Sequence, residues 1–290
     1  MHKFSLDKSS KKFHCPNCDK KRFVRFKNNE TGNYLNEQFG RCDREQKCGY
    51  FVKPSKSSIF SDDNFGVIQT IPTTTFATQP TYHDKTLLAK YSSKFQVSNL
   101  VIYLLKHFDN KTVWKVIKNY RVGTSNHWQG STVFWQIDNN KKIRCGKIMQ
   151  YDCNTGKRVK KPFNHITWMH KSLKLDGFVL QQCLFGLHNL GCITKRDTIC
   201  IVESEKTAII MSIVIQDRLW LATGSITNFN EKILTPVKEY NIIAYPDKLA
   251  FKVWHQTAKV LNNIGYHIQC SDFLEKIDVE VGGDLVDYLI

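Results

Sequence analysis

Four cysteines near the start of the chain have the spacing of a metal site. Two residues separate Cys15 from Cys18, five separate Cys42 from Cys48, and 23 residues lie between the two pairs. Thiolates that arrive in two close pairs, each on a tight turn, suit tetrahedral Zn²⁺. We therefore expect a zinc ribbon over residues 1–52. The alternative interpretation is four unrelated reduced thiols.

A second set of candidate ligands is acidic and lies far downstream. The candidates are Glu203, Asp247, Asp284 and Asp287. Glu203 directly follows one short apolar run, Asp247 lies two residues beyond another, and Asp284 follows a glycine pair. Carboxylates that converge from neighbouring strand ends suit Mg²⁺ or Mn²⁺ bridging to phosphate. Taken singly, each could equally be a solvated carboxylate or a residue at the start of a helix.

The segments that must position these carboxylates alternate between two patterns. The expected strands cover residues 198–202, 219–223, 241–245 and 266–270, with helices over 205–216 and from about Leu249 to Leu261. Continuous apolar runs are typical of parallel strands covered on both faces, and their alternation with helices predicts βαβ units. Residues 196–290 should therefore form a small parallel sheet flanked by helices, with its chemistry at the carboxyl ends of the strands.

The middle of the chain, residues 84–195, predicts a basic α+β region. Apolar residues at helical spacing run from Lys85 to about Asn119. A β-rich run at 131–137 and a second at 143–150 flank a turn and predict a hairpin. Residues 53–83, rich in Ser, Thr and Pro, predict a linker. The fold class is therefore α/β, with a zinc ribbon, an α+β middle region and a C-terminal sheet.

The net charge of +16 is unevenly distributed. Residues 1–60 carry 14 Lys and Arg against 6 Asp and Glu, residues 111–174 carry 14 against 2, and residues 197–290 carry 8 against 13. Clustered basic side chains interleaved with aromatic ones are typical of nucleic-acid binding, although a basic balance also fits a merely soluble surface. The candidate phosphate and nucleic-acid contacts are Arg22, Arg25, Arg121, Arg144, Lys147, Lys157, Arg158 and Lys206.

The composition indicates a folded protein and gives no sign of a membrane or secreted one. A hydrophobic content of 41% with 12% aromatic residues predicts a folded protein. No apolar run approaches the ~20 residues of a membrane span, and the first residues do not form a secretory signal. Ten cysteines without such a signal predict zinc ligands and buried thiols in a reducing, cytoplasmic environment.

Three segments resemble the motifs of the toprim domain, a catalytic fold shared by bacterial primases, topoisomerases and some nucleases. They are Ile201 to Ala208 (IVESEKTA), Ala244 to Lys248 (AYPDK) and Gly283-Asp284. A zinc ribbon, a basic middle region and then toprim is the order found in bacterial DNA primases. Residues 13–290 most resemble primase-like toprim proteins of bacterial mobile elements.

The chain departs from the toprim pattern at two positions. Tyr245 stands where these enzymes usually have the first aspartate of an Asp-x-Asp pair, and Ser204 replaces a common glycine. The zinc spacing also differs from that of the replicative primases, which have a shorter pair and a histidine. A site short of one carboxylate should bind metal more weakly.

The resemblance implies a DNA primase-like nucleotidyltransferase that binds single-stranded DNA and makes short primers for replication of a mobile element. Nucleoside triphosphates and a replicative helicase in trans are the implied partners, and no membrane is expected. Glu203, Asp247, Asp284 and Lys206 would be catalytic, and Asp287 would join the three carboxylates around Mg²⁺. The alternatives are a toprim metal-dependent nuclease and a catalytically weak DNA-binding accessory factor. A topoisomerase would need a nucleophilic tyrosine, and none is identifiable.

Overall fold

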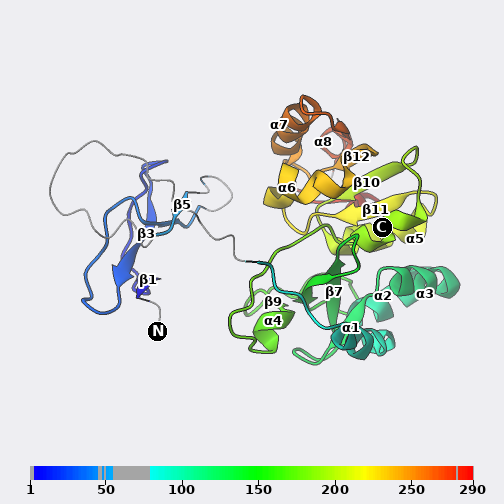
Figure 1. The fold of residues 1–290 in the computed structure, drawn as a ribbon, viewed down its shortest axis with the longest axis horizontal. Coiled ribbons are helices and arrows are strands. Elements are labelled where there is room, and N and C mark those ends of the chain that lie inside the picture. The colour runs from blue at the N-terminus through cyan, green and yellow to red at the C-terminus, as the bar shows by residue number, and fades with distance from the viewer. Residues whose placement is uncertain (1–2, 45–47, 49, 55–78, 279, 290) are drawn as a thin grey trace. The chain divides into compact units, whose positions relative to one another are not determined.

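The chain forms two compact units, Met1–Thr75 and Phe76–Ile290, drawn in Figure 1. The computed structural model describes residues 3–44, 48, 50–54, 79–278 and 280–289. Most of the predicted linker at 53–83 lies outside the described residues. The predicted middle region and the predicted parallel sheet both fall within the second unit.

The first unit is a small antiparallel sheet built around the cysteines. Its strands are β1 (Phe4–Leu6), β2 (Phe13–His14), β3 (Lys21–Asn28), β4 (Gly40–Cys42) and β5 (Phe51–Val52). The order is β1-β3-β4-β5, and β2 also pairs with β3. Phe23 is fully buried in a cluster with Cys15 and Cys42. A Cβ at Gly40 would lie 2.4 Å from the Phe23 ring, so only glycine allows this approach.

The second unit begins with short helices, as the apolar spacing predicts. They are α1 (Lys85–Ser92), the 3₁₀ turn η2 (Phe95–Val97), α2 (Asn99–His107) and α3 (Asn110–Asn119). Asp84 and Asp109 cap α1 and α3, because their carboxylates accept hydrogen bonds from the N–H groups of Thr86 (2.7 Å) and Thr112 (2.8 Å). The Asp109 cap starts a new helix, so the helical stretch is divided there.

An antiparallel sheet follows in the order β6-β7-β8-β9. Its strands are β6 (Gly123–Ser125), β7 (Ser131–Ile137), β8 (Ile143–Met149) and β9 (Ile166–Trp168), after which α4 (Met169–Ser172) begins. The predicted hairpin is confirmed as the β7–β8 pair. Every residue of β7 is buried, which identifies it as a central strand. The two outer strands were not predicted.

The predicted parallel sheet is also confirmed. It comprises β10 (Thr198–Val202), β11 (Leu219–Ala222), β12 (Asn241–Tyr245) and β13 (His267–Cys270), in the order β11-β10-β12-β13 with every pair parallel. The remaining helices are α5 (Glu205–Val214), α6 (Glu231–Leu234), α7 (Phe251–Asn262), α8 (Phe273–Lys276) and α9 (Leu285–Leu289), with 3₁₀ turns η3 (Leu187–Cys192), η4 (Ile226–Asn228) and η5 (Thr235–Val237). Among the described residues, no helix is long and apolar enough to span a membrane.

Alternate residues of β10 enter two different cores, one on each face of the parallel sheet. Ile199 and Ile201 pack into a cluster that contains Trp254 of α7. Cys200 and Val202 pack into a second cluster with α5, α2 and α3. Burial on both faces explains the continuous apolar run that predicted this strand.

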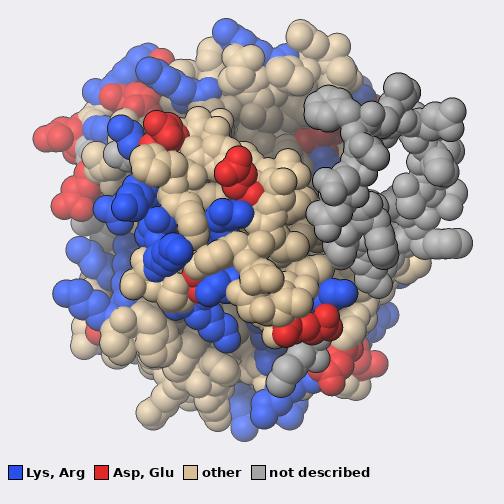
Figure 2. Space-filling view, turned by 90° about the vertical axis from the view of Figure 1, so that its left-hand side faces the viewer, with Lys and Arg blue, Asp and Glu red and all other residues tan. Residues whose placement is uncertain are grey.

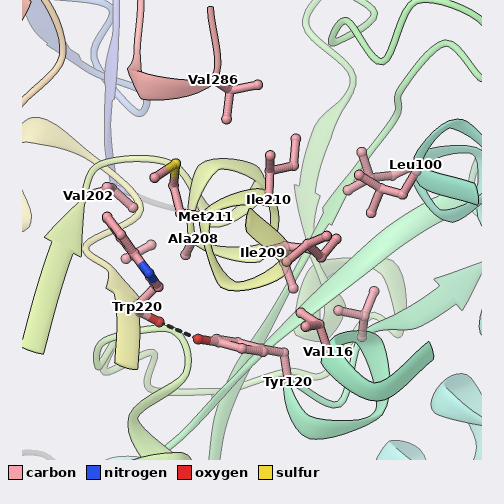
Figure 3. Packing of buried hydrophobic residues seen from close by; sticks show 14 of the residues in the cluster. Leu100, Val116, Tyr120, Val202, Ala208, Ile209, Ile210, Met211, Trp220 and Val286 are labelled. Carbon is pink, nitrogen blue, oxygen red and sulfur yellow. Dashed lines mark hydrogen bonds between the residues drawn. The ribbon is translucent and has the colours of Figure 1, made fainter. Parts of the chain in front are cut away.

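The second cluster joins the helical segment to the parallel sheet. Figure 3 shows Tyr120, which directly follows α3, extending toward Trp220 of β11. The Tyr120 hydroxyl donates a hydrogen bond of 2.7 Å to the Trp220 carbonyl and lies 2.7 Å from the Ser212 hydroxyl. Because Ile209 and Val116 share this core, the two predicted regions of the second unit are packed together through a common interior.

Candidate functional site

The four predicted zinc ligands meet at one point in the first unit. Their Sγ atoms all lie within 4.8 Å of one another, with Cys15 and Cys48 at 3.6 Å and Cys18 and Cys42 at 3.9 Å. Zn–S bonds of about 2.3 Å in a tetrahedron place sulfur atoms about 3.8 Å apart. The cluster therefore has the dimensions of a structural zinc site.

The surroundings of Cys48 and Cys42 change their thiol pKa values in opposite directions. The N–H of Tyr50, and then the Asn17 amide 3.5 Å from the sulfur, lower the pKa of Cys48 to about 6. Burial raises the pKa of Cys42 to about 12. Zinc binding would therefore have to displace a proton from Cys42, which makes metal affinity depend on pH.

The strand register brings two of the predicted carboxylates to one edge of the parallel sheet. Val202 and Tyr245 are register partners at the carboxyl ends of β10 and β12. Glu203 and Asp247 follow those ends by one and two residues. The prediction that both follow neighbouring strands is confirmed.

The pKa of Asp247 indicates that Asp284 and Asp287 lie near the same edge. Burial raises the pKa of Asp247 to about 8, and the negative charges of Glu203, Asp284 and Asp287 add to the increase. Burial also raises the pKa of Glu203, although the positive charges of Lys147 and Arg158 oppose that change. Three carboxylates thus act on Asp247 at this edge, which we call the carboxylate edge (Glu203, Asp247, Asp284 and Asp287).

Asp284 is fixed by hydrogen bonds on both carboxylate oxygens. The Thr207 hydroxyl of α5 donates to one oxygen. The N–H groups of Val286 (2.8 Å) and Asp287 (3.3 Å) donate to the other. The Asp287 carboxylate in turn accepts a hydrogen bond of 2.9 Å from the Asp284 N–H. The start of α9 and the first turn of α5 therefore hold this carboxylate in place.

The carboxylate edge is more open than the cysteine cluster. Within the described part of the chain, the cysteines are the one group of three or more potential ligands whose atoms lie within 4.8 Å of one another. Mg²⁺ usually keeps several waters and is bound through one or two carboxylates plus substrate phosphates. The described carboxylates therefore do not form a closed, fully protein-bound cation site.

A buried ion pair lies beside the carboxylate edge. Lys147 of β8 donates to both oxygens of Glu205 (3.0 and 3.1 Å) and to the Gly224 carbonyl (3.0 Å). The side chains are 11% and 1% exposed. Lys147 was predicted as a phosphate contact, yet its three donors are used within the protein. Gly224 has φ +76°, and a Cβ there would lie 2.9 Å from a Glu205 oxygen.

The other predicted basic contacts of the second unit fall into two groups. Arg158 and Lys157 are exposed, and Lys206 on α5 is half-buried. Arg144 is engaged elsewhere, since it pairs with Asp138 at 2.7 Å and donates to Gln181. Arg158 is thus the exposed cation whose charge acts on Glu203.

The remaining predicted basic residues lie at other places. Arg121 is exposed and follows α3 with φ +53°. In the first unit, Arg22 is exposed on β3, whereas the Arg25 guanidinium lies over the Phe13 ring at 5.1 Å and donates to the Leu35 carbonyl. Figure 2 shows patches of Lys and Arg side chains on one face of the molecule, among fewer acidic ones.

Tyr245, which stands in place of an expected aspartate, packs against the hydrophobic core. Its ring packs against Trp220 with centroids 5.6 Å apart. It belongs to the apolar cluster that contains α5. The side chain therefore supplies no carboxylate to the metal candidates.

Two family models match the chain. Residues 2–64 match a family described as a zinc beta-ribbon finger. Residues 98–248, just over half of the chain, match a family described as a domain of unknown function, DUF6371. The chain belongs to the DUF6371 family. A comparison with curated protein sequences finds no match.

The structure of this DUF6371 protein is similar to several solved primase structures. The primase fragment of the bacteriophage T7 primase-helicase has a TM-score of 0.40 and 13% identity, over 60% of this chain and 65% of that one. The RNA polymerase domain of Mycobacterium tuberculosis primase has a TM-score of 0.46 and 11% identity, over 70% and 76%. The zinc-binding and RNA polymerase domains of Aquifex aeolicus primase have a TM-score of 0.43 and 12% identity, over 98% and 76%. The chain thus spans less than two thirds of the phage fragment.

Proposed function

We propose that this DUF6371 protein is a toprim-type, primase-like nucleotidyltransferase that binds single-stranded DNA and synthesises short primers for a mobile element. The observation that supports the proposal is the position of Glu203 and Asp247 just after the carboxyl ends of the neighbouring parallel strands β10 and β12, with the charge of Asp284 acting on Asp247. The motif resemblance of the segments around these residues supports the same assignment. A replicative helicase acting in trans is the partner such an activity would serve.

The carboxylate edge suits a divalent cation because it crowds negative charge. Burial and three neighbouring carboxylates raise the pKa of Asp247 to about 8, so the residue holds a proton at neutral pH when no cation is nearby. A divalent cation would favour the ionised form of both Asp247 and Glu203. Bound Mg²⁺ or Mn²⁺ would stabilise the charge that develops on the transferred phosphoryl group.

Residues of this chain would perform the remaining tasks. Exposed Arg158 and Lys157, with Lys206 at the start of α5, would provide positive charge for the nucleoside triphosphate, and the charge of Arg158 acts on Glu203. Lys147 would act as a positioning residue, because it neutralises Glu205 and anchors the first turn of α5 next to Glu203. The zinc ribbon, with exposed Arg22, would contribute template binding.

A primer-synthesis assay tests the proposal directly. The purified full chain is incubated with circular single-stranded DNA, labelled ribo- or deoxyribonucleoside triphosphates, and Mg²⁺ or Mn²⁺. New oligonucleotides are the expected product, and Glu203→Gln should abolish them. Glu239→Gln is the matched control, because that exposed carboxylate pairs with Lys195 at 3.9 Å and belongs to no predicted site.

The other outcomes contradict the proposal in distinguishable ways. DNA that is shortened by the wild type and spared by Glu203→Gln would identify a nuclease. DNA that is bound, neither extended nor cut, would identify an accessory factor. The accessory role is the second candidate, because Tyr245 is used in the core and one expected carboxylate is missing. Primers made equally well by Glu203→Gln would place the active site elsewhere.

A further inference from the structure

A cluster of aromatic rings lies partly in solvent beside β9. Phe163 and His165 stack with centroids 4.3 Å apart and planes 18° apart. His165 meets Trp128 edge-on at 5.1 Å, and Trp128 meets His127 edge-on at 4.5 Å. We call these four residues the exposed aromatic cluster.

Phe163 and His127 are the exposed members of this cluster. The Phe163 side chain is 55% exposed, whereas Trp128 and His165 are half-buried. Trp128 packs against the core formed by the antiparallel sheet, so the cluster has a fixed base. Because Phe163 is 55% exposed while it stacks on His165, much of its surface is left to contact a flat apolar ligand.

The surroundings of the cluster are basic. Lys160 and Lys161, close before Phe163 in the chain, are exposed. The stretch 111–174, which contains the whole cluster, has 14 Lys and Arg against 2 Asp and Glu. An exposed ring flanked by cations fits a ligand that carries both flat bases and phosphates.

Hydrogen bonds connect the cluster to the segment that carries Arg158. The His165 N–H donates to the Val159 carbonyl (3.2 Å), and the Val159 N–H donates to the Gln150 carbonyl (3.0 Å). The adjacent Arg158 pairs with Tyr151 in a β-bridge, and its charge acts on Glu203. A short, paired segment therefore joins the aromatic rings to the residue whose charge acts on Glu203.

We propose that the exposed aromatic cluster binds unpaired bases of a single-stranded nucleic acid, with Phe163 as the stacking residue and Lys160 and Lys161 on neighbouring phosphates. Arg158 then leads the strand toward the carboxylate edge. Duplex bases already stack on one another, so an open protein ring favours single strands. Base binding by the cluster is independent of catalysis, and only the path toward Glu203 rests on the proposed function.

The test compares two exposed phenylalanines. Phe163→Ala and Phe273→Ala each remove an exposed ring that contacts aromatic neighbours, His165 and Trp128 for Phe163 and Tyr288 for Phe273. Phe273 lies in the acidic stretch 197–290 and serves as the matched control. Affinity is measured by fluorescence anisotropy on a labelled single strand of about 20 nucleotides, with the full chain.

Phe163→Ala should weaken single-strand binding about tenfold, and Phe273→Ala should leave it unchanged. The effect on duplex DNA of the same sequence should be much smaller. Affinity for single-stranded RNA is measured in parallel. A loss of affinity for single-stranded DNA or RNA that exceeds the loss for duplex DNA supports base binding by the cluster. Phe163→Trp keeps a flat ring and should retain binding. Lys160→Gln with Lys161→Gln should reduce the salt dependence of binding by about 0.7 per lysine.

Unchanged single-strand affinity in Phe163→Ala, with an intact circular dichroism spectrum, would overturn the proposal. An equal loss for duplex and single strands would also overturn it, because stacking would not be the cause. The proposed function is judged separately, since Glu203→Gln should bind DNA normally while failing to make primers. If the wild type makes no primers and Phe163→Ala weakens single-strand binding, the base-binding role of the cluster is supported and the primase function is refuted.

Discussion

Replacing Asp247 by asparagine should stabilise the metal-free second unit at neutral and alkaline pH. Burial and the charges of Glu203, Asp284 and Asp287 raise the pKa of Asp247 from 3.8 to about 8 in the folded protein. Below about pH 4 the residue is protonated in both folded and unfolded chains. Between about pH 4 and 8 only the unfolded chain releases the proton, so the free energy of unfolding falls. Asparagine does not titrate and avoids this loss.

The magnitude follows from the change in pKa. A difference of about 4 between folded and unfolded chains corresponds to about 6 kcal/mol above pH 8. Asp247 is only half-buried, so water screens part of the interaction. We therefore expect Asp247→Asn to raise the free energy of unfolding by about 3 kcal/mol at about pH 9, and by close to zero at about pH 4.

Urea unfolding followed by tryptophan fluorescence measures this difference. All six tryptophans lie between Trp114 and Trp254, so the signal reports the second unit alone. Divalent ions are removed from the buffer with a chelating resin and no soluble chelator is added, which leaves thiolate-bound zinc in place. Asp176→Asn, in an exposed loop position, is the matched control.

Two results would refute the reasoning. If wild type and Asp247→Asn lost stability in parallel as pH rose, the carboxylate would not be crowded by its neighbours. If millimolar Mg²⁺ at about pH 9 raised the free energy of unfolding equally in both proteins, the cation would not bind beside Asp247. The expected result is a larger increase for the wild type.

Three further predictions concern the rest of the fold. Cys15→Ser combined with Cys42→Ser should remove bound zinc, as measured by atomic absorption, and should weaken single-stranded DNA binding; full zinc occupancy would contradict the ribbon. Lys147→Met should lower the free energy of unfolding by about 3–5 kcal/mol, because Glu205 is 1% exposed and would lose its partner; the double change with Glu205→Leu should recover part of this loss in the same urea assay. Tyr120→Phe should lower the free energy of unfolding by about 1–2 kcal/mol, since a buried carbonyl loses its donor; an unchanged midpoint would show that water replaces the hydroxyl.

The strands β10, β11 and β12 could be predicted because their residues enter a core on each face of the parallel sheet, whereas β13 is exposed at His267 and Gln269. The runs that became β10 and β12 match the prediction residue for residue, at Thr198–Val202 and Asn241–Tyr245. In contrast, β6 and β9 are three residues long each. They exist through pairing with β7 and β8, and three residues carry too little periodicity to indicate a strand. Their omission reflects tertiary pairing that no local pattern encodes.

The site was predictable to the extent that topology alone determines it. Parallel strands end at one edge, so carboxylates placed just after β10 and β12 lie at that edge whatever their surroundings. The Lys147–Glu205 pair was missed because its members lie 58 residues apart and in different parts of the second unit. Spacing also gave no reason to select Thr207, whose hydroxyl reaches Asp284 from α5 only after the fold forms.

The distribution of partners indicates where at the carboxylate edge a cation would be most needed. Lys147 neutralises Glu205, and three hydrogen-bond donors already stabilise the Asp284 carboxylate. Asp247 and Glu203 are the two whose pKa values burial raises, so their ionised forms are the least satisfied. A divalent cation would therefore gain most by lying between Glu203 and Asp247, with Asp284 contributing through its fixed position. Glu203→Gln should then lower the pKa of Asp247, because it removes the first of the neighbouring charges that raise it. Carbon-detected NMR titration of the Asp247 carboxyl would measure that shift. An unchanged midpoint would show that the Glu203 charge does not act on Asp247.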